Sequence, residues 1–316
     1  MKLTYTIKSN ENFDNIKEVI KTQFQISDRL LLKLKQNNKI FLNNIPANIK
    51  SPVKPNDTVE ILLDFDEDNS NIVPTKMDLE ILFEDDYLLI LNKPAGYPIH
   101  PSMLHYEDSI SNGVKYYFDK IGLNKKIRPV NRLDKDTSGV VIFAKNEYIQ
   151  ENLVKQMKNN SFKKEYIAIC EGVLSNSSGT VNVPIARKPD SIIERCVDEY
   201  GDIAITHYDV IKQCDNFSVV HCILETGRTH QIRVHMAYLG NPIIGDTLYG
   251  NSSNLIDRQA LHSYKVTFVH PVTGQIMSIV APLFDDMKNI IWIDFDTFWD
   301  GVVWYINSKI IKIKIM

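Results

Sequence analysis

The sequence of 316 residues predicts an α+β fold: a mixed, largely antiparallel sheet with flanking helices, preceded by a small α/β domain. Two observations lead to this class. Strand-like runs outnumber helical segments and do not alternate regularly with them, as a doubly wound sheet would require. An acidic and polar segment after residue 64 also interrupts the periodic pattern, which separates a short N-terminal unit from the rest of the chain.

The N-terminal unit, residues 1–64, is predicted to contain two helices and then two strands. The helices are expected over residues 15–24 and 27–35, the second starting from Ser27 as its N-cap. The strands are expected over residues 39–42 and 58–63. Lys and Arg outnumber Asp and Glu here by ten to seven, so the unit is mildly basic in a chain of formal net charge −3.

The segment that follows, residues 65–76, is predicted to be an acidic linker, solvated and extended by self-repulsion. Residues 77–290 form the larger domain. Two apolar runs in residues 79–92 predict a hairpin, and apolar residues at four-residue spacing predict an amphipathic helix over 147–158 that packs on the sheet. Further strands are predicted at 167–170, 180–183, 204–211, 218–224, 264–269 and 275–280.

The most informative stretch of the sequence is residues 128–146. A turn at residues 137–139 precedes a β-branched and aromatic run at 140–144, which predicts a buried strand. Asp134 therefore lies just before a strand, at the rim of the sheet. On these residues alone, Asp134 and Asp136 are as well explained as carboxylates that cap the turn by accepting backbone N–H bonds.

The whole string resembles the catalytic motif of the RluA-like pseudouridine synthases: Arg-Leu-Asp, then Asp-Thr-Ser-Gly, then an apolar strand ending in Phe-Ala-Lys-Asn. Residues 92–101, 163–172 and 226–250 resemble three further motifs of that family, in the same order. The resemblance implies an isomerase that converts specific uridines of RNA to pseudouridine. One residue departs from the pattern: Asn131 stands where the family often has His, and Asn can hydrogen-bond but cannot titrate.

The resemblance assigns three residues to an active site. Asp134 would be the nucleophile, acting on a uridine whose base has left its helix. Arg233 would hold the Asp134 carboxylate in its ionised form, because arginine keeps its charge and its planar fork fits a carboxylate. Tyr166 would stack on the uracil and offer a hydroxyl for proton movement. The structural alternatives are a salt bridge for Arg233 and core filling for Tyr166.

The resemblance also implies where RNA binds. Arg132 would fill the gap left by the extruded base, and Arg228 would face the RNA backbone. The N-terminal unit resembles an S4-type RNA-binding domain, in which Arg29, Lys33 and Lys35 would contact phosphates in a salt-sensitive manner. For each of these residues, an ordinary solvated helix position is the alternative.

The arginine segment is predicted to form a helix over residues 230–239, with Thr229 as a possible N-cap and Gly240 as its C-terminal stop. His230 and His235 are five residues apart, on different helical faces, and no Cys or carboxylate completes a metal site with them. We interpret both as helix residues that could face RNA. We expect neither a metal nor a cofactor.

Two other functions remain open from the residues. Asp134, Asp136 and Thr137 also fit the Asp-x-Asp-Thr pattern of haloacid-dehalogenase-type phosphatases. Those enzymes need Mg²⁺ ligands and an apolar strand directly before the first Asp, whereas Pro-Val-Asn-Arg-Leu precedes it here. The second alternative is a non-catalytic RNA-binding protein of the same fold. The presence of all three active-site candidates disfavours it.

Neither a signal peptide nor a membrane-spanning run is visible in the sequence. The four cysteines show no CxxC spacing, so we interpret them as reduced thiols. We therefore expect a cytoplasmic enzyme whose partner is RNA, with ribosomal RNA favoured over transfer RNA, and no membrane or obligate protein partner.

The tail, residues 291–316, lies beyond the family resemblance and contains all three tryptophans of the chain. Its alternating Lys and Ile residues predict a strand or hairpin. Two interpretations stay open: an exposed aromatic patch that serves as a partner surface, or an extension without a role.

Overall fold

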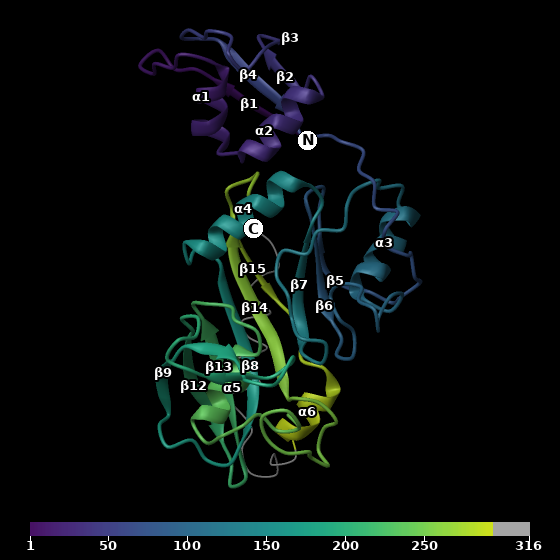
Figure 1. The fold of residues 1–316 in the computed structure, drawn as a ribbon, viewed down its shortest axis with the longest axis vertical. Helices are drawn as coiled ribbons and strands as arrows, with labels where there is room; N and C mark the ends of the chain where they lie inside the picture. Colours follow the sequence, from purple (N-terminus) through teal and green to yellow (C-terminus); the bar gives the residue numbers. More distant parts are fainter. Residues whose placement is uncertain (293–316) are drawn as a thin grey trace.

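The structure, a computed structural model, describes residues 1–292. An N-terminal four-stranded sheet is joined by a linker to a nine-stranded sheet, and a third sheet has two strands (Figure 1). The strand or hairpin predicted for the tail lies outside the described residues. Of the tail, only residues 291 and 292 are described, and they form the end of helix α6 (Asp285–Trp292). Across the described residues, no helix is both long and apolar enough to cross a membrane.

The N-terminal sheet has the strand order β1-β4-β2-β3 and is antiparallel throughout. The first predicted helix begins as α1 and continues as a π-helix, η1, which ends at Gln25 in the left-handed region. The second predicted helix is confirmed as α2, and the Ser27 side chain accepts a hydrogen bond from the Leu30 N–H as its N-cap. The bounds are β1 Lys2–Thr6, α1 Ile16–Val19, η1 Ile20–Phe24, α2 Asp28–Gln36, β2 Ile40–Leu42, β3 Ile45–Pro46 and β4 Thr58–Leu62.

The large sheet has the order β5-β6-β7-β14-β8-β13-β12-β9, with β15 paired to β14. Only the β7–β14 pair is parallel among the described strands, which confirms the mixed, largely antiparallel class. The predicted hairpin is β5–β6. The bounds are β5 Glu80–Glu84, β6 Leu88–Lys93, β7 Ser138–Ala144, β8 Lys163–Glu171, β9 Ser178–Asn182, β12 Ile205–Gln213, β13 Phe217–Leu224, β14 Leu261–Val269 and β15 Ile276–Val280.

Helices and a small hairpin complete the large domain. The amphipathic helix predicted over 147–158 is α4 (Glu147–Lys158), and its apolar residues Ile149 and Leu153 are fully buried. In Figure 1, α4 lies between the large sheet and the N-terminal sheet. The other elements are α3 Ile110–Lys120, α5 Gln231–Tyr238, and the two-stranded β10 Ile185–Arg187 and β11 Arg195–Val197.

The parallel β7–β14 pair fixes the end of the loop that carries Asp134. Ser138 and Gly139 of β7 pair with His262 and Ser263 of β14. Gly139 has φ +113, and a Cβ there would lie 2.2 Å from the Ser263 carbonyl oxygen. Only glycine fits such a close approach, so this position sets where β7 begins and hence where the loop ends.

The acidic linker is only partly solvated: Asp66 and Asp68 are exposed, as predicted, but Glu67 between them is buried. Glu67 is 7% exposed, and its carboxylate accepts hydrogen bonds from Arg128 at 2.6 and 2.7 Å and from Lys33 at 2.7 Å. Asn69 is equally buried and donates to the Lys125 carbonyl. The physical reason is that Lys33, before the linker, and Arg128, after it, neutralise the charge of Glu67 and hold this residue against the protein.

Further ion pairs and hydrogen bonds join α2 to α4. Arg29 Nε lies 3.4 Å from a Glu147 carboxylate oxygen, and Lys33 Nζ lies 3.5 Å from the other. The Ser27 hydroxyl donates to Glu151. The N-terminal domain is therefore docked on α4 by charged side chains, two of which were predicted to contact RNA.

We expect acid to weaken this docking through Glu67. Burial alone would raise the pKa of Glu67, but the hydrogen bonds from Arg128 and Lys33 outweigh it and lower the pKa from 4.5 to about 2. Because the pKa of Glu67 is lower in the folded protein than in the unfolded chain, ionised Glu67 stabilises the fold, by about 3 kcal/mol. This stabilisation is complete above the pKa of the unfolded chain, 4.5, and is lost as the pH falls towards 2. Denaturant unfolding of wild type and Glu67→Gln should therefore differ by about 3 kcal/mol near neutral pH and converge in acid.

The matched control is Glu107→Gln, which alters an exposed carboxylate. It should change the free energy of unfolding by less than about 0.5 kcal/mol. Equal effects of the two substitutions at neutral pH would contradict the docking role of Glu67.

Candidate active site

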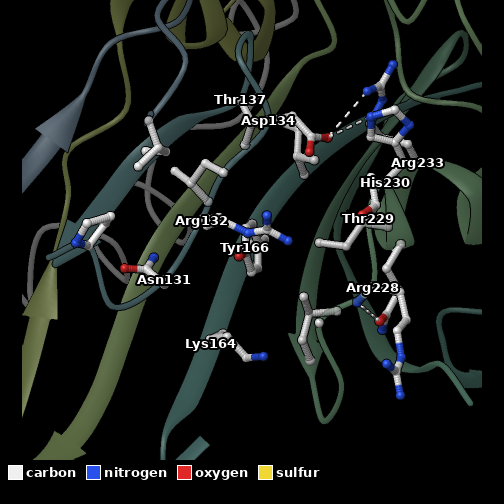
Figure 2. A pocket seen from close by; sticks show the side chains of 18 of the residues that line it. Asn131, Arg132, Asp134, Thr137, Lys164, Tyr166, Arg228, Thr229, His230 and Arg233 are labelled. Atoms are coloured by element: carbon white, nitrogen blue, oxygen red, sulfur yellow. Dashed lines mark hydrogen bonds and ion pairs between the residues drawn. The ribbon is translucent and has the colours of Figure 1, made fainter. Parts of the chain in front are cut away.

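One cavity, of about 570 Å³, collects residues from segments far apart in the sequence (Figure 2). Asp134, Tyr166 and Arg233 all line it, although they come from a loop, a strand and a helix. Arg132 and Arg228 line it as well. The structure thus brings together five of the residues predicted from sequence, while their chemical roles stay predictions.

Asp134 lies in the loop before β7, as predicted. Its carbonyl accepts the Thr137 N–H at 3.1 Å, which closes a turn, and the Thr137 hydroxyl accepts a hydrogen bond from the buried Gln259 amide. The Asp134 side chain is 27% exposed and faces the cavity. The turn is therefore closed by a backbone hydrogen bond and does not need the Asp134 carboxylate, which stays available to a ligand.

Asn131 fastens the same loop to β7. Its side-chain carbonyl accepts the Ile142 N–H at 2.9 Å, and its amide donates to the Val140 carbonyl at 2.9 Å. The side chain thus behaves like one residue of a neighbouring strand. Here the residue that departs from the family pattern has a positional role, and both of its polar atoms are directed at backbone.

Arg233 is fixed by hydrogen bonds to Asp246, a residue that was not predicted from the sequence. Its Nε and Nη2 donate to the two carboxylate oxygens of the fully buried Asp246 at 2.7 and 2.8 Å. The remaining Nη1 donates to Asp134 Oδ2 at 3.3 Å. Burial alone would lower the pKa of Arg233, but the Asp246 carboxylate outweighs it and raises the pKa. Arg233 is therefore a fixed cation directed at Asp134.

The start of the arginine helix differs from the prediction. The N-cap of α5 is His230, not Thr229, and its backbone has φ 58 with no side-chain capping bond. The left-handed conformation turns the His230 ring towards the cavity, where Nε2 lies 3.8 Å from Asp134 Oδ2. His235 does not face RNA: it is fully buried and its ring contacts Thr206 and the Val183 carbonyl.

Tyr166 lies on β8 opposite Cys222 of β13 and is almost fully buried. Burial raises the pKa of Tyr166 to about 12. The hydroxyl therefore keeps its proton at neutral pH and can serve as a donor. Lys164, two residues earlier and so on the same face of the strand, also lines the cavity, and burial lowers its pKa.

Lys93 contacts the backbone of the loop that carries Asp134. It is fully buried, and its Nζ donates to the carbonyls of Pro94, Tyr97 and Lys135 at 2.7 to 2.8 Å. Burial lowers the pKa of Lys93 to about 7. In its protonated form the ammonium group has three N–H donors, which match the three carbonyls, so Lys93 ties the segment after β6 to the residue following Asp134.

A groove of about 470 Å³ continues from the cavity towards the β10–β11 hairpin and shares Arg132 and Arg228 with it. Arg187 and Arg195 of the hairpin line the groove, as does Tyr200, which is 89% exposed. Arg228 lies at its rim, where it donates to the Ile203 carbonyl and pairs with Asp202 at 3.4 Å. The groove is thus rich in arginine although the chain carries a net negative charge.

The three predicted phosphate contacts of the N-terminal unit do not line the cavity. Arg29 and Lys33 lie on α2 in the ion pairs with α4 and the linker described above. Lys35, on the same helix, is exposed. These residues are therefore separate from the cavity around Asp134.

The geometry does not match the phosphatase alternative. The strand β7 follows Asp134, whereas that pattern requires a strand leading into the aspartate. Within residues 1–292, no three or more His, Cys, Asp and Glu side chains gather as potential metal ligands.

Comparisons with known proteins give a consistent result. A family model described as RNA pseudouridylate synthase matches residues 87–238. A Bacillus subtilis protein named Uncharacterized RNA pseudouridine synthase YhcT is 40% identical over 274 residues, which cover 86% of this chain and 90% of that protein. A Neisseria meningitidis protein named Ribosomal large subunit pseudouridine synthase D is 33% identical over 276 residues, 83% of this chain and 73% of its own.

Among solved structures, Human RNA Pseudouridylate Synthase Domain Containing 1 aligns with a TM-score of 0.55 at 24% identity. The alignment covers 65% of this chain and 84% of the human chain. At that identity the likeness concerns the fold alone.

Proposed function

This chain belongs to the RNA pseudouridine synthase family, and we propose that it isomerises uridines of ribosomal RNA in the cavity around Asp134. One observation carries the assignment of the site. The Asp134 carboxylate lies 3.3 Å from a buried arginine, beside Tyr166, in a cavity of about 570 Å³. That volume falls in the usual range for small-molecule sites, which suits one extruded nucleoside.

In this proposal the residues have distinct roles. The Asp134 carboxylate is the nucleophile, and Arg233 keeps it ionised in a partly desolvated cavity. The bond between the ribose and the ring nitrogen breaks, the base turns, and a bond to a ring carbon forms. The net change moves one proton from that carbon to the nitrogen, with no oxidation or reduction.

Tyr166 acts on the uracil base, and Arg132 acts where the base was stacked in its RNA helix. With a pKa of about 12, the Tyr166 hydroxyl is protonated at neutral pH, so it enters the reaction as a hydrogen-bond donor beside the uracil. Arg132 is exposed at the mouth of the cavity, where it can occupy the space that the base left in its helix.

The groove beside the cavity supports a polynucleotide substrate. Its arginines 132, 187, 195 and 228 offer several cations to successive phosphates, and Tyr200 offers an exposed ring for stacking. We place the RNA strand that flanks the target uridine there. Ribosomal RNA is favoured over transfer RNA because a relative at 33% identity is named for the large ribosomal subunit. We therefore propose that the enzyme acts in the cytoplasm.

We further assign residues 1–64 to an S4-like RNA-binding domain, 65–76 to a linker and 77–290 to the catalytic domain. The order of elements in the first domain and its mildly basic charge support this division. Lys35 and Arg29, whose side chains are accessible, are its best candidates for phosphate contacts. Lys33 could join them only by leaving Glu67.

The experiment is tritium release from unmodified RNA labelled at uracil carbon 5, with large-subunit ribosomal RNA and pooled transfer RNA as separate substrates. We expect release from the ribosomal RNA. Release from transfer RNA alone would contradict the substrate assignment, and release from neither would contradict the activity.

The same assay tests the N-terminal assignment. Reversing the charge of Arg29 and Lys35 to Glu should raise the KM for RNA more at low salt than at high salt, because phosphate contacts release counterions. An unchanged salt dependence would contradict phosphate binding by α2.

A further inference from the structure

Both protein contacts of the Asp134 carboxylate fall on the same oxygen. Arg233 Nη1 lies 3.3 Å from Oδ2, and His230 Nε2 lies 3.8 Å from that atom (Figure 2). The described residues make no side-chain hydrogen bond or ion pair to Oδ1. The two carboxylate oxygens are therefore inequivalent before any substrate binds.

Tyr249 contacts both partners of Asp134. Its hydroxyl lies 2.7 Å from His230 Nδ1, and the two rings meet edge to face with centroids 5.6 Å apart. Arg233 lies over the face of the same tyrosine, 5.0 Å from the ring centroid. The turn at residues 246–249 thus supports both groups that face Asp134, since Asp246 holds Arg233 and also accepts the Tyr249 N–H.

The hydrogen bonds of Tyr249 decide the tautomer of His230. The Tyr249 oxygen accepts the Arg195 N–H at 2.8 Å, and burial raises the pKa of Tyr249, so its hydroxyl keeps a hydrogen to donate. Within the described part of the chain, the acceptor in reach of that hydrogen is His230 Nδ1. A ring that accepts at Nδ1 carries its hydrogen on Nε2, which is the nitrogen facing Asp134.

The charge state of the His230 ring is consistent with a hydrogen on Nε2 alone. Burial lowers the pKa of His230; Arg233 and Arg195 add to that effect, while Asp134 and Asp246 oppose it. The imidazole is then neutral at neutral pH. It can offer Asp134 one N–H donor, and Arg233 is the cation that makes a hydrogen bond to the carboxylate.

We propose that His230, with its tautomer fixed by Tyr249, is a positioning residue that holds Asp134 Oδ2 together with Arg233. Asp134 Oδ1 is then the oxygen presented to the substrate. The separation of 3.8 Å shortens to a hydrogen bond in the substrate complex, as catalytic contacts commonly do. This inference rests on the proposed function, in which Asp134 is the nucleophile.

The left-handed backbone at His230 allows the Asn and Gln variants of this residue to be compared. At φ 58 the position favours Asn over most other residues. Asn places its amide near the location of Nδ1, whereas the longer Gln places its N–H near that of Nε2. A purely structural role of His230 therefore favours His230→Asn, and the positioning role favours His230→Gln.

Steady-state kinetics separate the two roles. We expect His230→Asn to lower kcat about 10- to 100-fold and His230→Gln less than about 5-fold, with KM for RNA unchanged in both. Tyr249→Phe should lower kcat about 3- to 10-fold, while Tyr238→Phe, an exposed tyrosine of α5, should leave it unchanged. An Asn variant as active as the Gln variant, or a fully active Tyr249→Phe, would overturn the proposal.

The tautomer can be measured without any turnover. Nitrogen-15 NMR of the full-length protein distinguishes hydrogens on Nδ1 and Nε2, and the His230 signals are identified by their loss in His230→Gln. We expect Nε2–H in the wild type and a mixed population in Tyr249→Phe. An Nδ1–H tautomer in the wild type contradicts the proposal even if the enzyme is active. Conversely, an inactive wild type with the Nε2–H tautomer contradicts the proposed function alone.

Discussion

Asp134→Asn is expected to fold, to bind RNA and to form no detectable pseudouridine. Asn preserves the size of the side chain and an oxygen for Arg233, so the hydrogen bond now measuring 3.3 Å has an acceptor in the variant. What disappears is the charged oxygen that we propose as the nucleophile, and removal of a nucleophile lowers kcat by about 10⁴-fold or more. The measurement is tritium release under saturating RNA, together with a binding titration.

Asp136→Asn is the matched control, because Asp136 lies in the same loop and does not line the cavity. It should lower kcat by less than about 10-fold. Activity within 10-fold of wild type in Asp134→Asn, or equal losses in the two variants, would contradict the assignment of the nucleophile.

Asp246→Asn is expected to damage both stability and catalysis. Asp246 is fully buried and accepts two hydrogen bonds from Arg233, which is itself 9% exposed at its side chain. Removing one member of a buried ion pair leaves a charge without its partner and costs about 3 to 5 kcal/mol. Arg233 also loses its orientation, so kcat should fall about 100-fold. Denaturant unfolding and tritium release measure the two effects.

A second substitution distinguishes stability from orientation. In the double variant Asp246→Asn with Arg233→Met, Arg233 no longer leaves an unpaired buried charge, so part of the lost stability should return while the loss of activity should persist. The control is Asp202→Asn, which removes the partner of the exposed Arg228 and should change stability by less than about 1 kcal/mol. A loss below that value in Asp246→Asn would contradict the role of the buried pair.

Much of the fold was predictable because apolar periodicity reports directly on local structure. The helix predicted over 147–158 has the observed bounds, and the bounds of the predicted strands agree with those in the sheet to within four residues. The loop position of Asp134 followed from the turn residues ahead of β7. Its approach to Arg233, 99 residues away, was expected only because the family resemblance paired them.

What escaped prediction depends on contacts between distant charges. The linker looked solvated because its sequence is acidic, yet Glu67 meets Arg128 and Lys33, which are 61 and 34 residues away. Asp246 carries no local pattern that sets it apart from a turn carboxylate. His230 adopts a left-handed backbone that a helical period cannot indicate, and that conformation directs its ring at Asp134.

In our proposal, this protein makes pseudouridine in RNA with Asp134 as the nucleophile. Site-resolved pseudouridine mapping of total RNA tests it most directly, in cells with the protein, without it, and with Asp134→Asn restored in its place. We expect one or a few ribosomal RNA sites to lose pseudouridine on deletion and to regain it with the wild type but not with the variant. Recovery of those sites by Asp134→Asn, or no lost site on deletion, would contradict it.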